Sequence, residues 1–433
     1  MKKIKFWPIF LSTTFVILIN VINLFVDEVV LSRHYNDTAF AAKNLSEPIL
    51  WCVPFLSGIL CTGAVRAYLN AKAAKDRKRA DISFSQGLWT SVMLGFILAT
   101  VMLVGRKTLV DLVAGGIQEY PITLEYLTGR SVSVLLCPVF LFLFAFAFAT
   151  GGTVICVIAS IISLAANIIL SSVLIKSMGV RGTSFATGIS MLPAILILCL
   201  HFPRLKRIPK FTIVFDGSVF AEAFMFGLRD SSSFLSVIIL QFVVNSLAVK
   251  KYENFGIVVV SVVINMIEAL IFLSHGIGNY EGRLIDYAFP RQKRNTARNG
   301  VMDSIKAAVV ESVILTILIL IFASWFVRIF NIDYANKADQ AAFVLRILSL
   351  SPIMICMIRI PAVFYGHTER AARSLICMIA GLGVLPGILA FVFGQISLAG
   401  MAIGMEIGFI LFIMLFYFVL LVIKKEKPFV WRV

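Results

Sequence analysis

Residues Trp7 to Leu31 read WPIFLSTTFVILINVINLFVDEVVL, and this apolar run with an acidic end decides the fold. The run is long enough for a helix that crosses the hydrocarbon core of a bilayer, which takes about 20 apolar residues. At helical pitch one stripe carries the polar residues Thr13, Asn20, Asn23 and Asp27. A carboxylate is costly against lipid, so we expect this stripe to face protein or a water-filled cavity.

Asp27 and Glu28 also fit a second interpretation, in which they cap the outer end of this helix in the headgroup region. The apolar residues Val29 to Leu31 continue the run beyond them, which favours a place inside the membrane. Asp27 is therefore a candidate functional residue, and Glu28 is a candidate for substrate binding or gating.

The composition of the whole chain agrees with a membrane protein. Of its 433 residues 60% are hydrophobic and 14% are charged, whereas soluble proteins have an apolar content of roughly 45–50%. We expect an all-α integral membrane protein.

The net charge of +16 comes from short basic clusters between apolar runs, which does not favour a nucleic-acid partner. The seven cysteines lie in apolar runs without C-x-x-C spacing and predict neither disulfides nor a metal site.

Twelve apolar runs are long enough to span a membrane. They cover approximately residues 7–31, 45–65, 83–104, 131–150, 154–175, 182–202, 223–249, 255–279, 302–327, 341–365, 372–394 and 399–423. With the N-terminus inside, 24 of the 39 Lys and Arg residues fall in inner segments and 11 in outer ones. The excess of positive charge predicts that both termini are cytoplasmic in a plasma membrane, the inner membrane of a bacterium.

A shift of 217 residues, half the chain, reveals a weak internal repeat. It places Phe55-Leu56-Ser57 on Phe272-Leu273-Ser274 and Arg66 on Arg283. We therefore predict two six-helix bundles with pseudo-twofold symmetry, a central cleft and alternating access by rocking. The predicted parts are residues 1–202, a cytoplasmic linker at 203–221, and residues 222–433.

The repeat makes the two halves chemically unequal. The positions that correspond to Asp27 and Glu28 are Val244 and Asn245, so the acidic pair occurs in one half only. Gln241 and Asn245 are then neutral polar candidates for substrate binding or gating. Asn167, in the middle of the fifth run, is a candidate hydrogen-bond partner for Asp27, although an amide there also suits plain helix packing.

Three more charged residues lie deep in apolar runs: Glu268, Arg359 and Glu406. An intramembrane Arg requires a carboxylate, so we expect Arg359 to pair with Glu406 or Glu268 in a structural or gating contact. The chain has no phosphate-binding glycine motif and no paired nucleophile and base, so we expect neither an enzyme nor an organic cofactor.

Several segments resemble the multidrug and toxic compound extrusion (MATE) family. They are Asn23-Leu24-Phe25-Val26-Asp27, Thr38 to Ala42 followed by Pro48, Asn167 to Leu170, and Gly179 to Ser190. The resemblance implies that Asp27 is the protonatable or sodium-linked residue and that Asn167 and Thr187 line the same pocket, with Asn23 beside them. Where the family often has Asp after the fifth-helix Asn, this chain has Ser171, which makes sodium the less favoured coupling ion.

We therefore expect a monomeric transporter that exports amphipathic or cationic small molecules in exchange for protons. The alternative is a flippase or exporter of a lipid-linked or anionic substrate. That function calls for a cleft rich in Arg and Lys, and Arg359 alone lies deep in a predicted helix.

Overall fold

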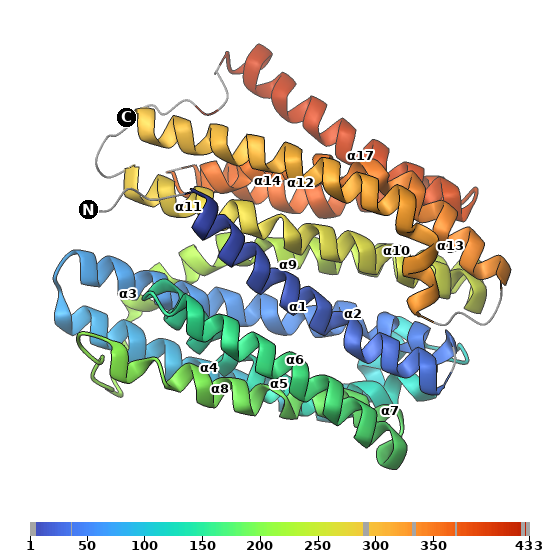
Figure 1. Ribbon diagram of the computed structural model, residues 1–433, viewed down its shortest axis with the longest axis horizontal. Coiled ribbons are helices and arrows are strands. Elements are labelled where there is room, and N and C mark those ends of the chain that lie inside the picture. The colour runs from blue at the N-terminus through green and yellow to red at the C-terminus, as the bar shows by residue number, and fades with distance from the viewer. Residues whose placement is uncertain are drawn as a thin grey trace. The chain divides into compact units, whose positions relative to one another are not determined.

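The protein is described by a computed structural model that covers residues 6–35, 37–288, 294–330, 335–368, 370–425 and 429. Within these ranges every regular element is a helix (Figure 1). Twelve helical segments of this part are long and apolar enough to cross a membrane. The predicted all-α membrane fold with twelve spans is confirmed.

The chain divides into two compact units. The N-terminal unit is Ile22–Leu235, and the C-terminal unit combines Met1–Val21 with Ser236–Val433. Two long helices, α1 (Phe6–His34) and α9 (Gly217–Lys251), therefore contribute to both units. The sequence-based boundaries at residues 202 and 222, and the pseudo-twofold symmetry, stay predictions.

Besides the ends of α1 and α9, the described residues of the N-terminal unit form seven α-helices. They are α2 (Asp37–Ser57), α3 (Gly63–Ala73), α4 (Arg77–Ala114), α5 (Tyr120–Ala149), α6 (Thr153–Met178), α7 (Val180–Ile189) and α8 (Met191–Cys199). The π-helical turn Gly58–Thr62 joins α2 to α3 in one span, and α7 and α8 form another.

The C-terminal unit contains the remaining helices. They are α10 (Glu253–Leu273), α11 (His275–Ala288), α12 (Arg294–Ile329), α13 (Ala335–Ile347), α14 (Ser351–Gly366), α15 (Ala371–Leu375), α16 (Leu385–Gly394) and α17 (Leu398–Phe418). The π-helical segment Ile376–Val384 connects α15 to α16, so these pieces form one span.

Local chemistry sets several helix ends. Asp76 accepts the Arg79 N–H at 2.9 Å and caps α4, because a carboxylate satisfies a free N–H at a helix start. Gly179, with φ of 63°, ends α6 directly before α7 begins. Gly151, with φ of 97°, makes the tight turn between α5 and α6.

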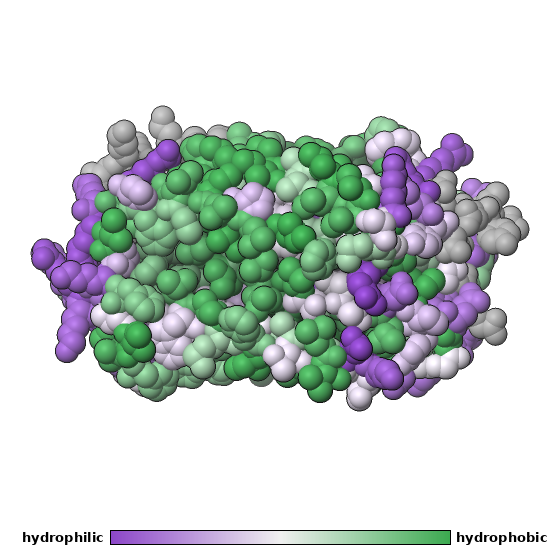
Figure 2. Space-filling model, turned by 90° about the horizontal axis from the view of Figure 1, so that it is seen from below, coloured by the Kyte–Doolittle hydropathy of each residue, from purple (hydrophilic) through white to green (hydrophobic). Residues whose placement is uncertain are grey.

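Aromatic rings pack the core of the N-terminal unit. Phe84 lies 4.8 Å from Phe146 and 5.7 Å from Phe202, measured between ring centroids, and Tyr68 lies 5.1 Å from Phe146. Large apolar side chains also cover the outside, where Val104 of α4 is 83% exposed. Figure 2 shows apolar side chains over most of the visible face and hydrophilic ones gathered at its two ends, as expected for helices surrounded by lipid.

Hydrogen bonds connect the predicted linker at 203–221 to α4. Asp81 accepts hydrogen bonds from the Arg207 guanidinium at 2.5 Å and the Lys210 N–H at 3.1 Å, and Ser85 accepts the Thr212 N–H at 2.9 Å. The early part of α9 continues this attachment, because Glu222 forms a 2.7 Å ion pair with Arg79. The linker and the start of α9 therefore belong to the N-terminal unit.

Candidate functional site: a buried network at Asp27

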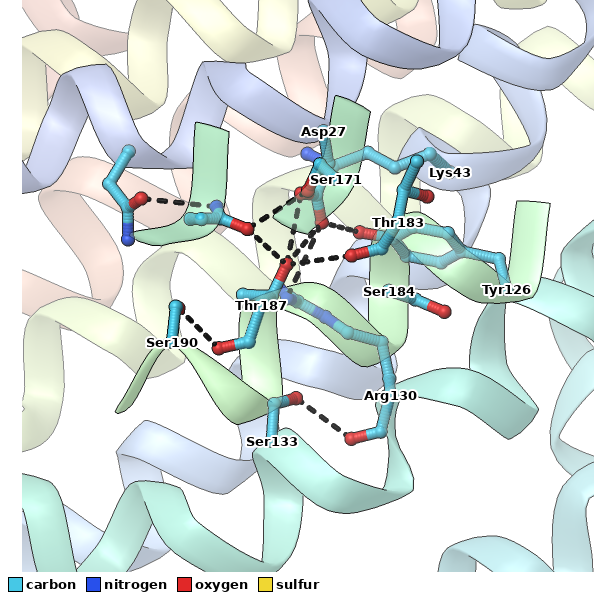
Figure 3. A network of polar contacts seen from close by, with 12 residues as sticks. Asp27, Lys43, Tyr126, Arg130, Ser133, Ser171, Thr183, Ser184, Thr187 and Ser190 are labelled. Atoms are coloured by element: carbon cyan, nitrogen blue, oxygen red, sulfur yellow. Dashed lines mark hydrogen bonds and ion pairs between the residues drawn. The ribbon is translucent and has the colours of Figure 1, made fainter. Parts of the chain in front are cut away.

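The carboxylate of Asp27 lies in the interior of the N-terminal unit. Asp27 is 2% exposed, and two hydroxyl groups donate to it (Figure 3). Tyr126 of α5 donates to Oδ2 at 2.8 Å, and the Thr187 hydroxyl of α7 lies 2.9 and 2.8 Å from Oδ1 and Oδ2. The acidic side chain faces protein, and α1 continues to His34, so Asp27 does not cap the end of this helix.

Amide and hydroxyl groups extend the network to α6. Asn167 donates through Nδ2 to Asn23 Oδ1 at 3.1 Å and accepts from the Ser171 hydroxyl at 3.0 Å. The Thr187 hydroxyl lies 3.4 Å from Asn167 Oδ1. The four predicted cation-coupling residues thus lie in one continuous network, although their role in coupling stays a prediction.

Glycines permit the helix approaches that build this network. A Cβ on Gly182 of α7 would overlap the Leu174 carbonyl of α6, and one on Gly129 of α5 would overlap Ser184 of α7. Because glycine has a hydrogen atom in place of a Cβ at both positions, α7 packs closely against α5 and α6. Thr187 is thereby brought to Asp27.

Arg130 of α5 is a charged neighbour that the sequence interpretation missed. Its Nη1 lies 3.6 Å from Asp27 Oδ2, and its Cζ lies 5.7 Å from the centroid of the Tyr126 ring. The predicted span began at residue 131 and assigned Arg130 to an outer connection, whereas α5 begins at Tyr120. The spacing of four between Tyr126 and Arg130 was the available signal that both lie on one helix face.

A buried ion cluster adjoins the site. Lys43 Nζ lies 2.5 Å from Glu28 Oε1 and 2.7 Å from Glu47 Oε1, and the three side chains are 5%, 1% and 4% exposed. Buried charges need such partners because their hydration is lost. Glu28, a predicted substrate or gating residue, is thus held in an ion pair. Lys43 and Glu47, spaced i and i+4 on α2, were not singled out from the sequence.

The other candidates belong to the C-terminal unit. Gln241 donates to Glu268 at 2.8 Å, and Ser351 donates to Glu406 at 2.6 Å. Asn245 is buried. The sequence therefore predicted polar residues that are buried in the C-terminal unit. It did not predict the hydrogen bond between Gln241 and Glu268.

Arg359 of α14 is 8% exposed and interacts electrostatically with Glu281 of α11, which is fully buried. A Cβ on Gly278 would lie 3.3 Å from Arg359 Nε, so α11 passes close to the guanidinium. Glu281 is a further buried carboxylate that the sequence interpretation missed.

The groups around Asp27 can exchange hydrogen bonds, and the carboxylate can also take up or release a proton. The described residues contain no group of three His, Cys, Asp or Glu side chains that could hold a metal ion. A carboxylate accepts hydrogen bonds only, whereas its protonated form also donates one. A change of charge on Asp27 would therefore reorder hydroxyl groups on α5 and α7.

A twelve-span helical fold with a buried ionisable network is typical of a membrane transporter, and comparisons with known proteins agree. Residues 8–173 match the family model MatE. The multidrug export protein MepA of Staphylococcus aureus strain bovine RF122 / ET3-1 is 22% identical over 394 residues, which cover 88% of this chain and 84% of the relative. MepA of Staphylococcus haemolyticus strain JCSC1435 is 22% identical over 326 residues, with coverages of 74% and 71%.

Solved structures show the same fold. An inward-facing multidrug resistance MATE family transporter of the MOP superfamily has a TM-score of 0.77 and 20% identity, covering 95% of this chain and 97% of that one. A MOP superfamily transporter from Pyrococcus furiosus Vc1 has a TM-score of 0.81 and 18% identity, covering 94% and 93%. The chain therefore has the fold of the MATE transporters, and its residues 8–173 match the model of that family.

Proposed function

We propose that this protein exports amphipathic, cationic small molecules across the plasma membrane in exchange for protons, and that Asp27 carries the coupling proton. The proposal rests on the surroundings of Asp27. Hydroxyl groups from α5 and α7 donate hydrogen bonds to its buried carboxylate. The similarity to multidrug export proteins supports the substrate class.

The proposed coupling follows from the two forms of the carboxylate. When ionised, Asp27 attracts Arg130 and accepts from Tyr126 and Thr187. A bound proton removes the negative charge and occupies one oxygen, so these contacts weaken together. Since the donors lie on separate helices, protonation would favour a second arrangement of α1 against α5 and α7 with lower affinity for the substrate.

The membrane setting is part of the proposal. An even number of spans brings both termini to one side, and the distribution of Lys and Arg favours the cytoplasm. We propose a monomer as the working unit.

Proton-linked transport in inverted membrane vesicles tests this function. A pH gradient is formed, organic cations are added one at a time, and collapse of the gradient is followed for the wild type and Asp27→Asn. Asp111→Asn is the control, because Asp111 is an exposed carboxylate of α4. We expect the wild type and the control to respond and Asp27→Asn, at equal protein level, to fail.

A wild type that responds to no cation would contradict the proposal. Transport of a lipid-linked or anionic substrate would then become the better assignment for the same fold. A response of Asp27→Asn equal to that of the wild type would remove Asp27 from the coupling mechanism while leaving export intact.

A further inference from the structure

Arg130 occupies an unusual position for a cation. Its side chain is 13% exposed, and its Nε and Nη1 are buried without a hydrogen-bond partner in the described part of the chain. The distance of 3.6 Å from Nη1 to Asp27 Oδ2 exceeds hydrogen-bond range, so charge rather than a directed bond relates the two groups. Figure 3 shows Arg130 extending from its helix toward Asp27.

The oxygen atoms around Asp27 suit a small hard cation. Besides both carboxylate oxygens, the hydroxyls of Tyr126 and Thr187 and the side-chain carbonyl of Asn167 converge there. Hard cations such as alkali and alkaline-earth ions prefer oxygen ligands of this kind. The set contains a single carboxylate, so it can balance one positive charge.

We propose that Arg130 is the built-in counter-cation of this oxygen cluster and that it makes the site selective for the proton by excluding sodium. The inference deepens the proposed function, on which it rests. A sodium ion bound to Asp27 would lie about 4 Å from the guanidinium, and at an effective dielectric constant of about 20 the repulsion weakens its binding about a thousandfold.

The guanidinium also opposes a bound proton, because a nearby cation favours the ionised carboxylate. A proton still binds where sodium does not, because it forms a covalent O–H bond with the carboxylate and needs no coordination shell. The guanidinium then keeps a second contact, the face of the Tyr126 ring, which attracts cations. The titratable groups that act on Arg130 are Tyr126, Asp27, Glu47 and Cys137, and Asp27 is the acid within ion-pair distance.

Sodium binding by the purified full chain tests the inference without any transport assay. Thermal unfolding is measured in detergent at one fixed pH, with sodium chloride or choline chloride at equal ionic strength. The variants are Arg130→Gln and Arg130→Met, which remove the charge, and Arg130→Lys, which keeps it. Each neutral variant is also combined with Asp27→Asn, so that one remains informative if the other does not fold.

We expect no sodium-specific rise in unfolding temperature for the wild type or Arg130→Lys. The neutral variants should gain a saturable rise that sodium but not choline produces and that Asp27→Asn abolishes. A sodium-specific rise in the unfolding temperature of the wild type that Asp27→Asn removes would overturn the inference. The inference would also be overturned if sodium did not raise the unfolding temperature of the neutral variants. This experiment measures sodium binding and not transport. A negative result is therefore distinct from a failure of proton-linked export.

Discussion

The hydroxyl of Thr187 lies 2.9 and 2.8 Å from the two carboxylate oxygens of Asp27, 160 residues earlier in the chain. This contact joins α7 to α1. A hydrogen bond to a charged group contributes about 1.5–3 kcal/mol, so Thr187→Val should lower the free energy of unfolding by about that amount. Proton-linked transport should fall in parallel, as measured in vesicles at matched protein level.

Thr183→Val is the matched control for this change. Thr183 is also buried on α7, four residues earlier, but its hydroxyl donates to the Val180 carbonyl of its own helix. We expect transport by Thr183→Val to stay near that of the wild type. Equal loss of transport in both variants would mean that α7 needs hydroxyl groups for packing rather than for contact with Asp27.

The ion cluster of Lys43 gives a prediction about stability. Lys43→Met would leave the buried carboxylates of Glu28 and Glu47 without their shared ammonium group. Breaking a buried ion pair on one side costs roughly 3–5 kcal/mol. The unfolding temperature should therefore fall strongly, and adding Glu28→Gln and Glu47→Gln should recover much of the loss. A triple variant less stable than Lys43→Met alone would contradict this account.

The close approach of α9 to the π-helical turn gives a prediction about packing. A Cβ on Gly227 would overlap the Ile59 carbonyl oxygen. Overpacking costs about 1–3 kcal/mol, and more against backbone, so Gly227→Ala should lower the unfolding temperature clearly. Glu222→Gln is the comparison, because its ion pair with Arg79 is partly exposed, at 24% and 36%, and is worth about 0–1 kcal/mol. The reverse order of effects would contradict the proposed packing.

Asp216, just before α9 and outside the predicted spans, gives a pH dependence. The hydroxyl and N–H of Ser218 and the N–H of Val219 donate to Asp216, and these bonds lower the pKa of its carboxyl group. A lowered pKa stabilises the fold above the ordinary pKa of Asp, and this contribution is lost as the pH falls through the lowered value.

The unfolding temperature of Asp216→Ala should therefore lie below that of the wild type near neutral pH. The two should converge as the medium is acidified below the ordinary pKa of Asp and through the lowered pKa of Asp216. A difference in unfolding temperature that is constant over this pH range would indicate that the charge of Asp216 does not contribute.

Hydropathy was enough to predict the fold class, because spanning helices need long apolar runs. Segment ends were less accurate where helices continue through polar turns. The run predicted at 131–150 is the second part of α5, which begins at Tyr120, and the early residues include Arg130 and other polar groups that lower the local hydropathy. Arg130 was therefore read as part of a loop, although it lies in the candidate site.

The candidate site was predicted in part. Asp27, Asn23, Asn167 and Thr187 were expected together from the polar stripe and the family resemblance, and the structure places them in one hydrogen-bonded network. The Tyr126 contact could not be predicted, because it depends on how α5 packs against α1, 99 residues away. Hydropathy carries no information on such contacts between distant helices.

Proton release on substrate binding tests the central claim most directly. The purified wild type and Asp27→Asn are placed in weakly buffered detergent solutions at a series of pH values, and an organic cation is added to each. We expect the wild type to acidify the solution by up to about one proton per protein molecule, since binding and protonation oppose each other. Asp27→Asn should bind the cation without acidification. Binding without proton release by the wild type, or equal release by both, would contradict coupling through Asp27.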